Sequence, residues 1–177
     1  MDKIELKKLI LDLLEKAIIQ VYATDKDVIT NMVSERCVCA RLAFHLETII
    51  RACDEHNHFD GYYVDVEYDR MADANPKHIV GEKKHVCDLL IHSRGHKKPD
   101  NLLALEMKVH DNNTNVTCDL CRLKHLVQSS DENSQGFVRD TIVGVFLRIQ
   151  DKKYKIRTLD GDINNGTPSD EVEKPMN

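Results

Sequence analysis

Long apolar runs are absent from this sequence, and their absence limits where the protein is expected to reside. No 18 consecutive apolar residues occur anywhere in the chain, whereas a transmembrane helix needs about 20. Residues 1–8 (MDKIELKK) mix charged and apolar side chains, so they lack the apolar stretch of about 7–15 residues that marks a secretion signal. We therefore expect a cytoplasmic protein that does not span a membrane.

Internal repeats are also absent and low-complexity runs are few, which favours one ordinary globular domain. A chain of 177 residues, 41% hydrophobic and 31% charged, is long enough to bury one core. We place this domain at residues 1–159. Residues 160–177 hold five acids and one lysine among Asn, Gly, Ser and Pro, a composition typical of a disordered acidic tail.

Charge gives little guidance about a nucleic-acid partner. The net charge is −5, and residues 160–177 supply −4 of it, which leaves the expected domain nearly neutral. Several basic residues, Arg122 and Lys124 among them, either form a local basic surface or are simply solvated. Composition therefore neither requires nor excludes a polyanionic partner.

The six cysteines are expected to be reduced thiols, because no secretion signal precedes them, and several should pack as small hydrophobic side chains. Cys118 and Cys121 form a single Cys-x-x-Cys pair, which Cys37 and Cys39 would have to complete. A second Cys-x-x-Cys is missing and the pair lies in a helical pattern. A structural zinc site is therefore not favoured.

Two helical patterns open the chain. Residues 3–22 repeat apolar side chains at helical spacing and predict a helix that packs on the domain. Residues 28–53 carry a second stripe, which includes Met32 and in which Glu35 alone is charged. That carboxylate either pairs with a nearby arginine, Arg36 or Arg41, or faces a functional site.

Strand patterns follow, with one more helix between them. Residues 62–70 alternate apolar side chains with Asp65, Glu67 and Asp69, and residues 85–92 enclose Asp88 in an apolar run. The second and third strands should form an antiparallel hairpin. The remaining elements are predicted as a strand at 102–110, a helix at 116–128, and strands at 141–149 and 154–158.

Glu106 and Lys108 are two charges inside the apolar strand at 102–110. Side chains at i and i+2 of a strand share a face, so both emerge on the same side. Burying charge in a core strand is costly unless the group is paired or functional. Either a structural ion pair or a site explains them.

With Glu35 before the sheet, Asp88 in the second strand and Glu106-x-Lys108 in the third, the chain resembles the PD-(D/E)XK (restriction-endonuclease-like) nuclease superfamily over residues 28–158. The resemblance implies an α/β (α+β) fold with an αβββαβ core, whose mixed central sheet is flanked by helices and joined by the extra N-terminal helix. Cys87 departs from the proline of the superfamily's name, and a Gln-x-x-x-Tyr helix is missing after the third strand.

Several runs also look like a group of small uncharacterised bacterial proteins of this superfamily. They are residues 87–95 (CDLLIHSRG), 101–108 (NLLALEMK) and 35–42 (ERCVCARL), together with the Asp65-x-Glu67-Tyr68-x-Arg70 segment. Small nucleases of this fold often dimerise, so a homodimer is expected by analogy. A partner protein in a bacterial defence system is expected for a non-catalytic member of the fold.

The resemblance implies a metal site for Mg²⁺ or Mn²⁺. Two close carboxylates repel unless a cation lies between them, and Mg²⁺ takes one or two carboxylates while keeping several waters. Lys108 would orient the attacking water or neutralise charge in the transition state. The expected metal ligands are Asp88, Glu106 and the Met107 carbonyl, with Glu35 and Glu67 as accessory ligands.

Substrate contacts are expected from Arg94, His92 and Lys124, since a guanidinium matches a phosphate bidentately. Asp119 and Lys124 either line the cleft or face solvent. The predicted function is a metal-dependent nuclease that hydrolyses DNA rather than RNA, with Glu35, Asp88, Glu106 and Lys108 as the catalytic set. The alternative is a catalytically silent module that keeps the fold and binds nucleic acid or a protein.

Overall fold

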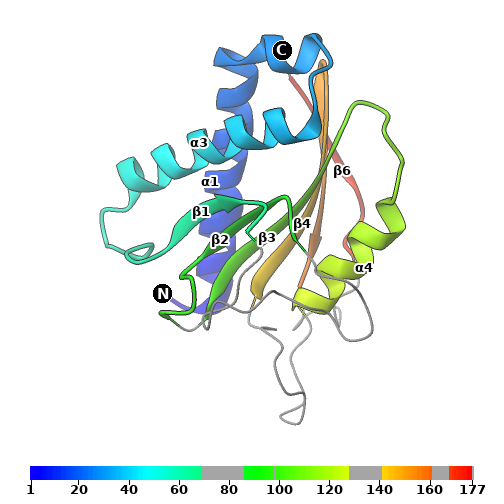
Figure 1. Cartoon of the computed structure of the whole chain (residues 1–177). Helices are drawn as coiled ribbons and strands as arrows, with labels where there is room; N and C mark the ends of the chain where they lie inside the picture. The colour runs from blue at the N-terminus through cyan, green and yellow to red at the C-terminus, as the bar shows by residue number, and fades with distance from the viewer. Residues whose placement is uncertain (69–85, 98, 128–140, 161–167, 177) are drawn as a thin grey trace.

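The computed structural model describes residues 1–68, 86–97, 99–127, 141–160 and 168–176. Within these residues, four helices and six strands form an α+β fold (Figure 1). The helices are α1 (Lys3–Thr24), α2 (Lys26–Thr30), α3 (Glu35–Cys53) and α4 (Val116–Val127). The strands are β1 (Tyr63–Val66), β2 (Leu89–His92), β3 (Asn101–Val109), β4 (Thr141–Gln150), β5 (Lys153–Leu159) and β6 (Val172–Pro175).

The strands form one mixed open sheet in the order β1-β2-β3-β4-β5-β6. All neighbouring pairs are antiparallel except β3 and β4, which are parallel and are joined through α4. A parallel pair requires a crossover connection, and here a helix supplies it. The predicted hairpin between the second and third strands and the mixed sheet flanked by helices are both confirmed.

Helices pack on both faces of the sheet (Figure 1). Residues of α1 and α3 join one core with Leu103, Leu105 and Met107 of β3. Leu123 and Val127 of α4 join a smaller core on the opposite face. Because successive strand side chains alternate between faces, Ala104, Glu106 and Lys108 of β3 point toward α4.

The predicted N-terminal helix is confirmed and extends to Thr24. A capping box between Asp2 and Glu5 starts it, satisfying backbone N–H groups that the first turn leaves without partners. No helix among the described residues is long and apolar enough to cross a bilayer.

The predicted helical stripe over residues 28–53 was wrong in one respect, because the helix is interrupted. Met32 has a φ of 52° and is 72% exposed, so it leaves the buried stripe and separates α2 from α3. The Ser34 side chain then caps α3 by accepting from the Cys37 N–H. This break places Glu35 in the first turn of α3, at the end of the helix nearest the polar cluster described below.

Two strands are shorter than expected. β1 ends at Val66, since Glu67 turns out of the strand with a φ of 50°. β2 begins at Leu89, so Asp88 lies immediately before the strand and not inside it. Residues 69–70 and 85 of the expected strands lie outside the described part of the chain.

The prediction of a disordered tail was wrong for residues 168–176. β6 pairs with β5, and acids in and just before β6 meet basic side chains of β5: Lys155 lies 3.2 Å from Glu171 and Lys153 lies 3.1 Å from Glu173. The acidic composition therefore matches a basic neighbour, which a count of the tail alone does not reveal. Residues 161–167 and 177 lie outside the described residues.

Gly144 of β4 lets α4 approach the sheet closely. A Cβ at this position would lie 3.2 Å from a Val127 methyl and 3.4 Å from the Leu159 Cβ. We expect Gly144→Val to destabilise the protein by about 1–3 kcal/mol, because the added methyls overpack a dense core. Urea unfolding followed by circular dichroism would measure this, with Gly144→Ala expected to have the smaller effect. An unchanged unfolding midpoint for the valine variant would contradict close packing of α4.

Candidate functional site

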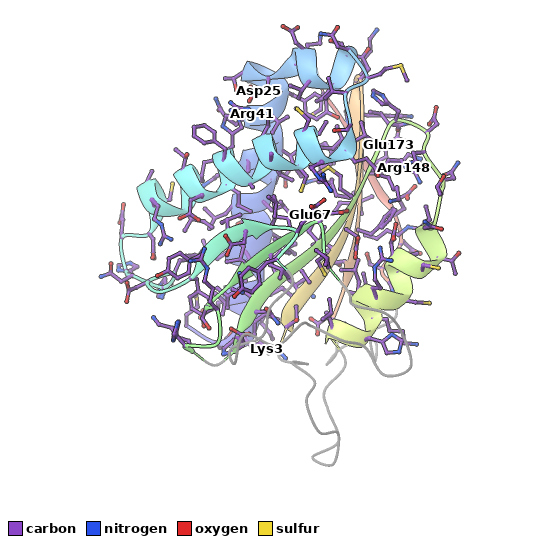
Figure 2. The ribbon with its side chains drawn as sticks, in the orientation of Figure 1. Lys3, Asp25, Arg41, Glu67, Arg148 and Glu173 are labelled. Carbon is purple, nitrogen blue, oxygen red and sulfur yellow. The ribbon has the colours of Figure 1, made fainter. Side chains whose placement is uncertain are left out.

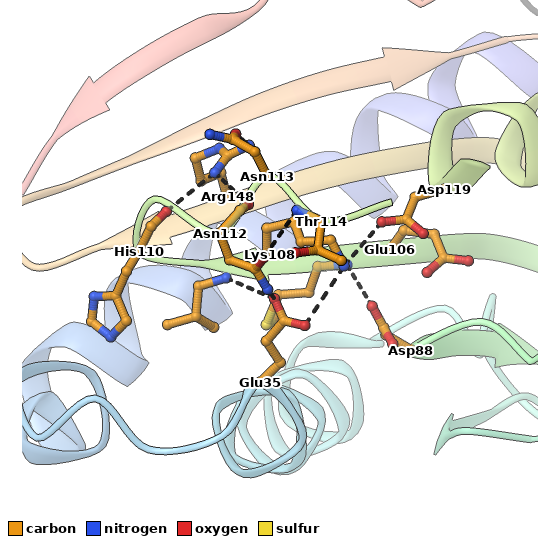
Figure 3. Close-up of polar contacts among 12 residues, drawn as sticks. Glu35, Asp88, Glu106, Lys108, His110, Asn112, Asn113, Thr114, Asp119 and Arg148 are labelled. Atoms are coloured by element: carbon orange, nitrogen blue, oxygen red, sulfur yellow. Dashed lines mark hydrogen bonds and ion pairs between the residues drawn. The ribbon is translucent and has the colours of Figure 1, made fainter. Parts of the chain in front are cut away.

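A polar cluster lies where α3, α4 and the start of β2 meet β3 (Figure 3). It joins residues that are far apart in the sequence, and each element contributes one or two of them. We call it the acidic cluster, and its members are Glu35, Asp88, Glu106, Lys108, Asp119 and Arg122.

Strand register brings Asp88 to the third strand. Leu89 pairs with Leu105, so Asp88 lies across from Glu106 in the antiparallel hairpin. An Asp88 carboxylate oxygen accepts the Met107 N–H at 2.7 Å. This side-chain bond extends the hydrogen-bond ladder one step beyond the pair formed by Leu89 and Leu105. Because the N–H and C=O of one strand residue point to the same edge, the Met107 carbonyl also faces the edge where Asp88 lies.

Lys108 is held by carboxylates from two helices. Its ammonium nitrogen lies 3.0 Å from an Asp119 oxygen on α4 and 3.6 Å from a Glu35 oxygen on α3. Burial lowers the pKa of Lys108, but the hydrogen bond to Asp119 and the charges of Asp119 and Glu35 outweigh burial and raise it. Lys108 is therefore a charged ammonium, and within the described chain its ion-pair partners are these two residues and not Glu106.

Glu35 faces the acidic cluster and pairs with neither Arg36 nor Arg41. One of its oxygens accepts the Val109 N–H at 3.2 Å and the Asn112 side-chain amide at 3.1 Å. The arginines that might have paired with it are engaged elsewhere: Arg36 with Glu67 at 2.7 Å, and Arg41 with Asp25 at 2.9 Å (Figure 2).

The loop after β3 is fixed by Arg148 of β4. The guanidinium donates to the backbone carbonyls of His110 and Asn112 and to the Asn113 side chain (Figure 3). These bonds hold the loop so that Asn112 can donate to Glu35. Sequence reasoning did not single out Arg148 or Asn112, since nothing local connects them to the acids.

Arg122 belongs to the acidic cluster, but the sequence analysis did not predict this. It named Arg122 only as one residue of a local basic surface. Its guanidinium binds both oxygens of Glu106, at 2.8 Å and 3.1 Å, and it also contacts Asp119. Asp119 is 1% exposed, so it does not face solvent; it is buried within the acidic cluster. Residues three apart on a helix share a face, and this spacing is the signal that could have linked Arg122 to Asp119.

Burial raises the pKa of two carboxylic acids in the acidic cluster. Burial raises the pKa of Glu106 to about 8; the charge of Asp88 raises this pKa further, and the hydrogen bond from Arg122 lowers it. Burial likewise raises the pKa of Asp88, with Glu35 and Asp119 adding to the effect and the Met107 N–H and Lys108 opposing it. Four carboxylates thus face two cations, and two of these carboxylates, Asp88 and Glu106, resist ionisation.

A cleft of about 390 Å³ opens onto the cluster from one side. Glu35, Asp88 and Asn112 line it, and Arg36 and Glu67 lie on the same wall. Glu106, Lys108 and Asp119 are buried deeper. Solvent or a ligand therefore reaches Asp88 and Glu35 directly. Glu67, which sequence analysis predicted as an accessory ligand, lines this cleft but forms an ion pair with Arg36.

Three predicted substrate contacts are not brought to the cluster. His92 is fully buried and pairs with Asp65 at 2.9 Å, so it has no surface to offer a substrate. Arg94 donates two hydrogen bonds to the same Asp65 carboxylate, which satisfies the fork expected for a phosphate. Lys124 is exposed and lies two residues after Arg122, nearly opposite it around the helix.

All six cysteines are free thiols. Cys39 is buried, which raises the pKa of its thiol, and it donates to the Asp88 backbone carbonyl at 3.2 Å. Cys118 and Cys121 are exposed on α4.

Among the residues that the structure describes, no group of three or more His, Cys, Asp or Glu side chains is arranged to hold a metal ion as it stands.

No family model matches this chain, and neither curated proteins nor solved structures provide a match.

Proposed function

We propose that this protein is a metal-dependent nuclease that hydrolyses phosphodiester bonds in DNA. One observation carries the proposal: Asp88 at the start of β2 and Glu106-x-Lys108 on β3 meet with Glu35 of α3. The chain order of helix, three antiparallel strands, crossover helix and parallel strand supports the proposal, because it agrees with the αβββαβ order that the resemblance implies. Sequence motif and topology thus support the same proposal.

The donor set fits a hard divalent cation such as Mg²⁺ or Mn²⁺. Four carboxylates against two cations leave a formal deficit of two positive charges. The pKa values of Asp88 and Glu106 are raised chiefly by burial, and the neighbouring carboxylates add to the shift. Asp88, Glu106 and the Met107 carbonyl would hold the ion, with Glu35 on the cleft side. When bound, such an ion polarises a phosphoryl oxygen and lowers the pKa of a bound water.

The protein's own residues would position the reactants. Lys108 keeps its charge and is fixed by Asp119 and Glu35, so it can donate to an attacking water or to a phosphate oxygen without reorganising. Glu35 lies at the cleft wall and can accept a hydrogen bond from that water. The cleft beside Asp88 is where a phosphodiester would approach.

A second candidate function is a catalytically silent module that binds nucleic acid or a protein. The observation that favours it is the fork between Arg122 and Glu106, which satisfies both carboxylate oxygens without a metal ion. In that case the acidic cluster would be a closed ion-pair network that stabilises the fold.

Cleavage assays distinguish the two functions. The purified protein is incubated with single-stranded, double-stranded and branched DNA and with RNA, in Mg²⁺, in Mn²⁺ and in EDTA. We expect DNA to be cut in either metal and not in EDTA. If no substrate is cut in any metal while DNA binding persists, the silent module is the correct function.

A further inference from the structure

We propose that Arg122 is the exchangeable counter-cation of the acidic cluster: its guanidinium holds Glu106 until a divalent cation takes its place there. This inference rests on the proposed function and deepens it, because it names what controls metal occupancy. Arg122 acts by positioning Glu106 and does not have to touch the substrate.

Arg122 and a metal ion would compete for the same carboxylate. Its Nε and Nη2 each donate to one oxygen of Glu106, at 2.8 Å and 3.1 Å, so both oxygens already carry a charge-assisted hydrogen bond. A guanidinium and a divalent ion sharing one buried carboxylate would also repel each other at short range. Under the proposal, metal binding to Glu106 displaces Arg122 from it.

Arg122 is placed so that it can move at low cost. Its side chain is 22% exposed while that of Glu106 is 2% exposed, so the guanidinium lies toward the surface and the carboxylate stays fixed in β3. Arg122 also contacts Asp119, three residues earlier on α4. After release from Glu106 it keeps this second partner, and no buried charge is left alone.

Charge balance agrees with this exchange. If Arg122 stays with Asp119 while a divalent ion binds Asp88 and Glu106, the four carboxylates face four positive charges. Without the ion, Arg122 is the nearest cation to Glu106 and partly offsets the effect of burial. The arginine thus stabilises the empty site and lowers its affinity for metal.

Calorimetric titration of metal-stripped protein with MnCl₂ tests the inference. Arg122→Gln is expected to bind Mn²⁺ at least about tenfold more tightly than wild type, since a charge-assisted hydrogen bond no longer has to be broken. Lys124→Gln is the matched control: it removes the same charge from the same helix, but from the solvent side, and should stay within about twofold of wild type.

Melting temperatures provide a second measurement if Arg122→Gln folds poorly without metal. Mn²⁺ should then raise the melting temperature of Arg122→Gln more than that of wild type, and Arg122→Lys, which keeps charge but loses the fork, should lie between them. Equal or weaker Mn²⁺ binding by Arg122→Gln overturns the exchange but leaves the metal-dependent nuclease intact. Absence of Mn²⁺ binding to both proteins overturns the exchange and the metal site together.

Discussion

Replacing Lys108 by alanine is expected to lower the rate of DNA cleavage by about 10²–10⁴-fold, the range for loss of one positioned proton-transfer or charge-stabilising group. Lys108 is the only ammonium in the acidic cluster as described, and two carboxylates fix it. Single-turnover cleavage in Mg²⁺ measures the loss. Lys153→Ala, which removes an exposed lysine paired with Glu173, should cleave at the wild-type rate.

Lost activity alone would not separate a catalytic Lys108 from a structural one, because removing it leaves Asp119 buried with one cation fewer. Breaking one side of a buried pair costs about 3–5 kcal/mol. The double variant Lys108→Met with Asp119→Asn removes both charges and should recover much of that stability. If Lys108 is catalytic, the double variant folds and remains inactive. Recovery of cleavage would show that Lys108 acts only as the partner of Asp119.

Replacing Asp88 by asparagine is expected to abolish metal-dependent cleavage and at the same time to stabilise the metal-free protein. Asparagine has the same shape, and its side-chain oxygen can still accept the Met107 N–H. The change removes a carboxylate whose pKa is raised by burial and by Glu35 and Asp119. At pH 8 in EDTA we expect a melting temperature about 2–4 °C higher, which corresponds to about 1 kcal/mol in a chain of this size.

The stability that Asp88 and Glu106 contribute is expected to fall as pH rises. Both Asp88 and Glu106 have raised pKa values in the folded protein, so the folded state keeps their protons to higher pH than the unfolded chain does. Stability that these groups contribute is therefore lost as pH rises, from about 4 for the unfolded carboxyls to about 8 for folded Glu106. Asp88→Asn should lose less stability than wild type across this range.

Melting curves from pH 5 to pH 8, with and without Mg²⁺, measure this effect. Mg²⁺ should flatten the wild-type dependence, since the ion neutralises the carboxylates, and should have no effect on Asp88→Asn. Asp60→Asn is the control, because Asp60 is an exposed carboxylate 3.6 Å from Lys97 and far from the cluster in the chain. A lower melting temperature for Asp88→Asn at pH 8 would contradict the charge deficit.

Much of the secondary structure follows from periodicity. The helices at 3–22 and 116–128 and the strands at 102–110, 141–149 and 154–158 all appear within two residues of their predicted ends. Errors arose where a local break outweighed the pattern, as at Met32 with its positive φ. β6 was missed because the acids in it and just before it pair with basic side chains of β5, and sheet pairing, not local composition, brings these side chains together.

The sequence by itself determined which side chains of β3 share a face. A strand alternates sides at every residue, so Glu106 and Lys108 had to emerge together. It also placed Glu35 on the inner side of a helix. These inferences need only local geometry, and the structure agrees with each of them.

Only the tertiary structure decided which charge meets which. Lys108 pairs with Asp119 and Glu35, Glu106 pairs with Arg122, and Asp65 takes both His92 and Arg94. These partners are set by how α4 packs over Gly144 and by the point at which each strand ends. Such contacts join residues distant in sequence, and periodicity carries no information about distance between elements. Glu106 and Lys108 of β3 therefore belong to a six-residue network in which four carboxylates face only two cations.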